Sequence, residues 1–262
     1  MLKRETLAQE CFAECLGTFI LVFFGAGSVA AMVMKGNYDS FWELSVMWGL
    51  ACALAIYVTG GVTETHINPA VTICLAVFRG FDRKKIIPYI VSQIIGAFLA
   101  AAATFGLYFN NFRDYEAAEG IIRGAAESKA DAGIFFTFPQ DGLSNVQAFI
   151  TEAAITALLL IVIFAVSDEK NTAAPSGGLS ALVIGIVIAV IGGTFGSLTG
   201  FALNPARDFG PRLFAVLAGW GKVSLPGPDG YFWVPILGPI VGALGGGWVY
   251  EKLIHTFFVR EK

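Results

Sequence analysis

Residues 200–208 read GFALNPARD and residues 64–70 read ETHINPA, so the triplet Asn-Pro-Ala occurs twice in the chain. Asparagine is a favoured helix N-cap, and proline suits the first helical position because that residue's N–H has no partner in the helix. Short apolar segments follow, at roughly 68–79 and 204–217. A helix of about twelve residues rises ~18 Å, little more than half of a ~30 Å hydrocarbon core. We therefore expect two half-helices that enter a membrane and stop there.

The composition of the whole chain also indicates a membrane protein. Of its 262 residues, 56% are hydrophobic and 14% are charged, whereas soluble domains carry about 25% charged residues. The net charge of −3 gives no reason to expect nucleic-acid binding. Each of six apolar stretches is long enough, at about 20 residues, to cross a bilayer. These stretches lie at roughly 8–34, 41–61, 84–108, 145–167, 178–195 and 232–256.

The two triplets belong to an internal repeat. Asn204 follows Asn68 by 204 − 68 = 136 positions, and Glu152 follows Glu14 by 152 − 14 = 138. Each unit contains three spans and one half-helix, so the second unit enters the membrane upside down, and the functional site is expected at the repeat interface near the midplane. We predict an all-α membrane protein with one channel domain, 1–262. Its repeats are about 7–108 and 145–256, joined by one long polar loop, about 109–144.

The distribution of lysine and arginine predicts the orientation, because cytoplasmic loops are enriched in both. Ten basic residues would be cytoplasmic if both termini are: Lys3, Arg4, Arg79, Arg83, Lys84, Lys85, Lys170, Lys252, Arg260 and Lys262. Six would be external: Lys35, Arg113, Arg123, Lys129, Arg212 and Lys222. The sequence therefore favours cytoplasmic termini and an external 109–144 loop.

The segments before the triplets, 60–67 and 196–203, are rich in glycine and threonine. Non-helical backbone at membrane depth survives only where it lines a cavity or is buried in protein. We expect extended re-entrant loops whose carbonyls replace the water shell of a solute. The expected carbonyls are those of Glu64, Thr65 and His66 in the first loop, and of Leu198, Thr199, Gly200 and Phe201 in the second.

Two helix N-termini that face each other place positive dipole ends at the centre of the pore. The amides of Asn68 and Asn204 would act there as donors, so a neutral hydroxyl passes while a cation is repelled. Arg207 follows the second triplet, and a charge at this depth is a functional candidate by default. It can donate hydrogen bonds to solute hydroxyls; the alternative is a structural ion pair with Asp208. Arg212 lies four residues after Asp208, a spacing that favours a structural pair.

Glu14 and Glu152 occupy equivalent positions in the first and fourth spans. We interpret each carboxylate as a brace that accepts backbone N–H bonds from its own re-entrant loop. The alternative is an ion-coupled transporter that uses these acids. His66 is likewise interpreted as a loop brace rather than a gate. Because His66 and His255 are the only histidines and lie far apart, we expect no metal site and no cofactor.

Other residue types argue against catalysis and disulfides. The third alternative is an intramembrane enzyme, but no Ser/His or Asp/Asp arrangement suggests one. The four cysteines lie in apolar stretches, where they are expected to act as small hydrophobic residues, and Cys74 is a candidate for facing the pore. Taken alone, Trp48 is better explained by packing than by a pore role.

These residues resemble the aquaporin superfamily (major intrinsic proteins), and within it the bacterial glycerol facilitators of the aquaglyceroporin branch. The resemblance covers nearly the whole chain; its most specific blocks are GFALNPARDFGP at 200–211, HINPAVT at 66–72 and ECLGT at 14–18. It implies a passive channel in the inner membrane for glycerol, small polyols and water, assembled as a homotetramer. It also implies a selectivity filter of Trp48, Phe201 and Arg207, with Gly192 leaving room for the solute.

Further positions support the glycerol branch, and one departs from it. Residues typical of that branch are Tyr108, Asp208, Arg212, Pro235 and Ile236. Small residues at helical spacing that would permit close helix contact are Gly96, Ala100, Gly238, Gly242 and Gly246. Where glycerol facilitators usually read Ser-Gly-Ala-His, this chain has Thr63-Glu64-Thr65-His66. We expect the Glu64 carbonyl to face the pore and its side chain to turn away to a donor.

Overall fold

The computed structural model describes residues 6–176 and 178–259, and these form a bundle of helices. The long helices are α1 (Leu7–Lys35), α2 (Phe41–Thr59), α4 (Ile86–Leu107), α7 (Asn145–Val166), α8 (Ser180–Thr199) and α10 (Val234–Val249). The short ones are α3 (Pro69–Phe78), α5 (Phe109–Glu119), α6 (Lys129–Ala132), α9 (Pro205–Ala215) and α11 (His255–Val259). Six helical stretches in the described residues are long and apolar enough to cross a membrane, with α10 counted in a continuous stretch from Pro228 to Phe258. The predicted all-α membrane fold is confirmed.

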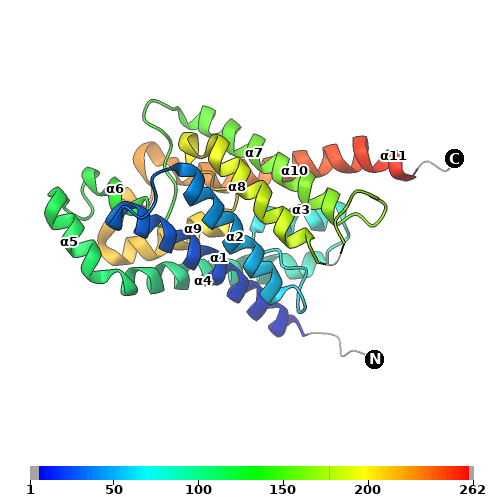
Figure 1. The fold of residues 1–262 in the computed structure, drawn as a ribbon, viewed down its shortest axis with the longest axis horizontal. Coiled ribbons are helices and arrows are strands. Elements are labelled where there is room, and N and C mark those ends of the chain that lie inside the picture. The colour runs from blue at the N-terminus through cyan, green and yellow to red at the C-terminus, as the bar shows by residue number, and fades with distance from the viewer. Residues whose placement is uncertain (1–5, 177, 260–262) are drawn as a thin grey trace.

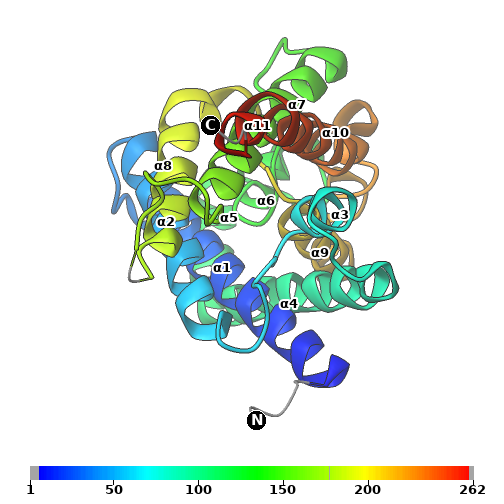
Figure 2. The ribbon, with the colours of Figure 1, turned by 90° about the vertical axis from the view of Figure 1, so that its right-hand side faces the viewer.

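The chain is built from two similar halves that exchange their short helices. In one half α1 packs against α2 and α4, and in the other α7 packs against α8 and α10. The half-helix α3 packs against α10 of the second half, while α9 packs against α4 of the first. Helices α3 and α9 lie at different positions along the long axis and overlap when the molecule is viewed end-on (Figures 1 and 2). The two halves therefore meet along the line of the two half-helices.

Glycines bring paired long helices close together. A Cβ atom on Gly96 would lie 2.1 Å from the Cys15 carbonyl oxygen, so α4 touches the backbone of α1 there. A Cβ on Gly242 would lie 2.1 Å from the Ala153 carbonyl oxygen, which brings α10 equally close to α7. The small residues that the sequence predicted at close helix contacts thus serve contacts inside one chain.

The segment 109–144 is not the long polar loop that we expected. It contains α5 and α6, and its aromatic side chains enter a buried cluster with Trp220. The rings of Phe112 and Phe135 stack with centroids 5.4 Å apart. The sequence hides this core because its apolar residues, such as the isolated Phe112 and the short run Ile134–Phe136, follow no regular period. The segment is a folded cap at one end of the bundle (Figure 1).

The beginning of α1 and the end of α11 lie at the end of the bundle opposite α5 and α6 (Figure 1). This follows from the even number of long helices, since six crossings return the chain to its starting side. Four basic residues used to predict the orientation, Lys3, Arg4, Arg260 and Lys262, lie outside the described residues.

Candidate functional site

The two Asn-Pro-Ala triplets begin α3 and α9 and are tied to each other. Asn68 Oδ1 accepts the Ala70 N–H at 2.9 Å, and Asn204 Oδ1 accepts the Ala206 N–H at 2.9 Å. Asn68 Nδ2 donates to the Leu203 carbonyl at 2.9 Å, while Asn204 Nδ2 donates to the Ile67 carbonyl at 2.7 Å. Because an amide carries two N–H groups, each asparagine retains one donor that a solute can use.

The backbone before each triplet is extended and strained at matching positions. Thr65 (φ 50°) and Ile67 (φ 42°) adopt the left-handed region, and so do Phe201 (φ 40°) and Leu203 (φ 56°). The two pairs differ by the repeat offset, 201 − 65 = 136 and 203 − 67 = 136. Non-glycine residues in such regions cost about 1–3 kcal/mol each. Glu64 is not among the positive-φ residues, so its replacement of a glycine introduces no strain of this kind.

Glu14 on α1 bonds the first extended segment. Its carboxylate accepts the backbone N–H groups of His66 at 2.8 Å and Ile67 at 2.7 Å. The Thr63 hydroxyl donates to the same carboxylate at 2.9 Å, and Gln93 Nε2 donates to it at 2.7 Å. All these partners are donors, which is the arrangement that suits an ionised carboxylate.

Glu152 on α7 bonds the second extended segment in the same way. Its carboxylate accepts the N–H groups of Ala202 at 2.9 Å and Leu203 at 3.0 Å, and the Thr199 hydroxyl at 2.6 Å. Both glutamates are fully buried. Each strained segment is therefore hydrogen-bonded to a carboxylate of its own half of the chain.

The second extended segment is shorter than the sequence suggested. Leu198 and Thr199 complete the last turn of α8, and the segment starts at Gly200, which ends that helix with φ 76°. The Leu198 carbonyl accepts the Gln140 N–H at 2.8 Å and is therefore directed at the 109–144 segment. The expected pore-lining carbonyls of Leu198 and Thr199 are a wrong prediction, because both residues continue α8 and their carbonyls accept from Gln140 and from the Tyr231 hydroxyl.

A cavity of about 460 Å³ runs through the bundle past both triplets. Its lining includes Phe201, which follows the last turn of α8, and Ser180, at the first turn of α8. A helix of twenty residues is about 30 Å long, so the cavity extends along most of a bilayer core. Other residues on the lining are Trp48, Cys52, Glu64, Thr65, His66, Ile67, Asn68, Val71, Leu75, Arg79, Ile163, Ser167, Ile184, Ala202, Leu203, Asn204 and Arg207.

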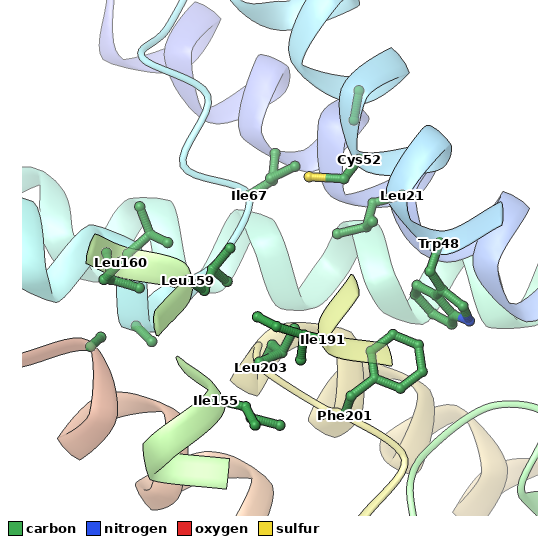
Figure 3. Close-up of a cluster of buried hydrophobic side chains, with 14 of the residues drawn as sticks. Leu21, Trp48, Cys52, Ile67, Ile155, Leu159, Leu160, Ile191, Phe201 and Leu203 are labelled. Atoms are coloured by element: carbon green, nitrogen blue, oxygen red, sulfur yellow. The ribbon is translucent and has the colours of Figure 1, made fainter. Parts of the chain in front are cut away.

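Trp48, Phe201 and Arg207 meet on this lining. The Trp48 and Phe201 rings are arranged edge to face, with centroids 6.4 Å apart (Figure 3). Arg207 Cζ lies 4.2 Å from the centroid of Trp48, a cation–π contact. Arg207 is buried, and its Nη1 has no hydrogen-bond partner in the described part of the chain. The three side chains thus combine an aromatic wall with an unused donor.

Gly192 lies against the Phe201 ring, behind the group formed by Trp48, Phe201 and Arg207. A Cβ atom at position 192 would lie 2.9 Å from Phe201 Cε2 and 2.6 Å from Ser45 Oγ. Gly192 does not itself line the cavity. The space that the missing side chain leaves is occupied by Phe201 and Ser45.

His66 and Glu64 lie at the start of the first extended segment. His66 is buried, with Nδ1 3.1 Å from Thr72 Oγ1 and Nε2 3.4 Å from Glu64 Oε2. The side chain of Glu64 is 72% exposed, and Glu64 lines the cavity. The side chain therefore reaches a partner, as expected, while most of it stays exposed.

The cysteine prediction is also corrected by side-chain direction. Cys74 is buried with its thiol directed at α10, where Sγ donates to the Ala243 carbonyl at 3.1 Å. Cys52 on α2 lines the cavity instead. Position along an apolar helix did not distinguish the two, because the direction of each thiol depends on how its helix is rotated in the bundle.

Asp208 and Arg212 form a fully buried pair that fixes the 109–144 segment to α9. Asp208 Oδ2 accepts both the N–H of Thr137, at 2.7 Å, and its hydroxyl, at 2.8 Å. Arg212 Nη2 donates to the Thr137 carbonyl at 2.6 Å. The predicted structural pairing of Asp208 with Arg212 is present. Thr137 was not predictable as a partner of this pair, because no local sequence pattern marks it.

Comparison with known proteins identifies the family. The profile of the major intrinsic protein family matches residues 1–250. The chain belongs to this family. It is 53% identical over 256 residues to the glycerol uptake facilitator protein of Escherichia coli (strain K12), covering 97% of this chain and 91% of that protein. The glycerol uptake facilitator protein of Haemophilus influenzae is 52% identical over 252 residues, which is 95% of each chain.

A solved structure agrees with the fold. The aquaglyceroporin from Plasmodium falciparum superimposes with a TM-score of 0.86 at 34% identity, covering 97% of this chain and 99% of that one. The resemblance found from the two triplets therefore extends over the whole fold, and the chain is a member of a channel family.

Proposed function

We propose that this protein is a passive channel for glycerol and related small neutral solutes, including water. The observation that carries the proposal is the group of Trp48, Phe201 and Arg207 on the cavity lining. A polyol has hydroxyls on one side and C–H groups on the other, so it needs hydrogen-bonding groups opposite an apolar wall. Arg207 Nη1 supplies a buried donor without a partner among the described residues, and the two rings supply the wall.

Along the cavity, the carbonyls of the extended segments and the asparagine amides take over the hydrogen bonds that the solute loses from water. We assign this role to the carbonyls of Glu64, Thr65 and His66, and to those of Gly200 and Phe201. Glu14 and Glu152 hold these segments in their strained conformation through backbone N–H bonds.

Ions are excluded by the positive groups on the cavity lining. Arg207 is a fixed cation on the lining. The N-termini of α3 and α9 add positive dipole ends where Asn68 and Asn204 meet. An ion has to shed a strongly bound water shell, whereas a neutral hydroxyl exchanges one hydrogen bond for another.

For the assembly and location, we propose a homotetramer in the inner membrane with both termini cytoplasmic. The whole chain, 1–262, would act as one channel domain with repeats at about 7–108 and 145–256 and an external 109–144 segment. The basic residues support this orientation, and family membership supports the membrane location.

Stopped-flow light scattering on proteoliposomes tests the function. Purified protein should raise glycerol permeability well above that of empty liposomes, with a low activation energy. Permeability should not depend on a proton or sodium gradient. Glycerol permeability equal to that of empty liposomes would refute the proposal, and a requirement for either gradient would favour the ion-coupled alternative.

A further inference from the structure

We infer that Glu64 forms a second polyol-binding site in the cavity, one that favours solutes with hydroxyls on adjacent carbons. The inference rests on the proposed function and deepens it by naming a residue that would set substrate preference. Glu64 is not needed for the conformation of its segment: its φ is not positive, and His66 is the only described residue that hydrogen-bonds its carboxylate.

The position of Glu64 separates this site from the Trp48–Phe201–Arg207 group. A Cβ on Gly49 of α2 would meet the Gly185 carbonyl of α8, and one on Gly196 would meet Phe41, so these two helices run antiparallel. The end of α2 therefore lies near the start of α8, at Ser180. Glu64 follows α2 there, whereas Phe201 follows the opposite end of α8.

Among the described residues that line this end of the cavity, Glu64 is the only charged one that has no close ion pair with a permanently charged side chain. Arg79 also lines the cavity, but its Nε lies 2.7 Å from Glu251 Oε1. The hydroxyl of Ser167 donates to the Ile163 carbonyl at 2.7 Å, and that of Ser180 donates to the Val166 carbonyl at 3.0 Å. Glu64 is thus the strongest acceptor offered to a solute here.

The chemistry of a carboxylate selects the ligand. Its two oxygens point in nearly the same direction and can accept hydrogen bonds from two neighbouring hydroxyls at once. Oε2, 3.4 Å from His66 Nε2, keeps further acceptor capacity, because each carboxylate oxygen has two lone pairs. The apolar side chains of Val71, Leu75 and Ile184 line the cavity as well, so the C–H side of the polyol has a surface to contact.

The test compares 1,2-propanediol with 1,3-propanediol, which have the same atoms but differ in hydroxyl spacing. We expect the wild-type channel to show a lower half-saturation concentration for 1,2-propanediol. Glu64→Gln keeps the size of the side chain but only one acceptor oxygen. Its half-saturation concentration for 1,2-propanediol should rise about threefold to tenfold, which is less than the full loss of a hydrogen bond to a charged group would cause. The value for 1,3-propanediol should change less, so the preference should shrink towards one.

Two further measurements make the result decisive. Glu169→Gln removes an exposed acid that does not line the cavity, and its preference should equal that of the wild type. Thermal unfolding of Glu64→Gln in detergent should match that of the wild type, which shows that the segment is intact. An unchanged diol preference in Glu64→Gln overturns the inference, even where glycerol flux supports the channel. A wild-type protein without any glycerol flux instead refutes the proposed function.

Discussion

The substitution Glu152→Gln tests whether the carboxylate brace holds the strained segment in place. Replacing one carboxylate oxygen by an NH₂ group puts a donor against a donor. The least costly orientation leaves only the Leu203 N–H without its acceptor, since Thr199 and Ala202 share the other oxygen. A buried N–H without a partner costs about 1–3 kcal/mol. The two remaining bonds also weaken, because bonds to a charged acceptor are about twice as strong as neutral ones.

The total loss is therefore about 2–4 kcal/mol. This is comparable to the ~2–6 kcal/mol stored in the left-handed conformations of Phe201 and Leu203, at about 1–3 kcal/mol each. Since about 1.4 kcal/mol changes an equilibrium tenfold, the segment should leave its native conformation in much of the population. We expect glycerol permeability per folded channel to fall at least about tenfold.

Stopped-flow flux into proteoliposomes, normalised to the amount of folded protein, measures this effect. Thermal unfolding in detergent gives the matching loss of stability. Glu169→Gln removes an exposed glutamate by the same chemical change and should leave both values near those of the wild type. Wild-type flux together with wild-type stability in Glu152→Gln would refute the brace, because the geometry would then have no energetic consequence.

Three further predictions concern other parts of the molecule. Asp208→Asn leaves Arg212 buried without its counter-charge and should lower stability by about 3–5 kcal/mol, read by thermal unfolding; an unchanged midpoint contradicts it. Mercuric chloride should inhibit the wild type and Cys74→Ala but not Cys52→Ala, because Cys52 lines the cavity; equal block of all three points to another site. Burial and the neighbouring Glu116 raise the pKa of Asp131 to about 6, against about 3.9 in an unfolded chain. The folded cap binds this proton more tightly, so its stability should fall as pH rises from about 4 to 6, and Asp131→Asn should remove that part of the slope in Trp220 fluorescence melts.

Much of the fold was predictable because its signals are local or periodic. The long apolar stretches had to be spans, since a charge-poor run of this length is stable in a bilayer. Asn68 and Asn204 marked helix starts because capping depends on a few adjacent residues. The repeat offset then placed the two half-helices at equivalent positions of two inverted halves, and the equivalent glutamates followed from the same symmetry.

The 109–144 segment and the exact extent of the second extended segment were not predictable in this way. Phe112 and Phe135 stack across 23 positions, 135 − 112 = 23, and no periodic pattern connects them. Leu198 and Thr199 could have been helix or loop from their residue types. In the helical conformation, the Leu198 carbonyl accepts a hydrogen bond from the N–H of Gln140, a residue distant in sequence.

The sequence by itself determined the membrane class, the six spans, the two helix caps and the residues from which a solute pathway could be built. Only the tertiary structure decided which atoms face that pathway. Cys52 lines the cavity while Cys74 turns to α10, and the Glu64 carboxylate lies beside His66 with most of the side chain exposed. The physical reason is that the direction of a side chain depends on the rotation of its helix and on contacts between distant segments. The two triplets show both parts: their caps are local, but their amides reach across to each other's segment.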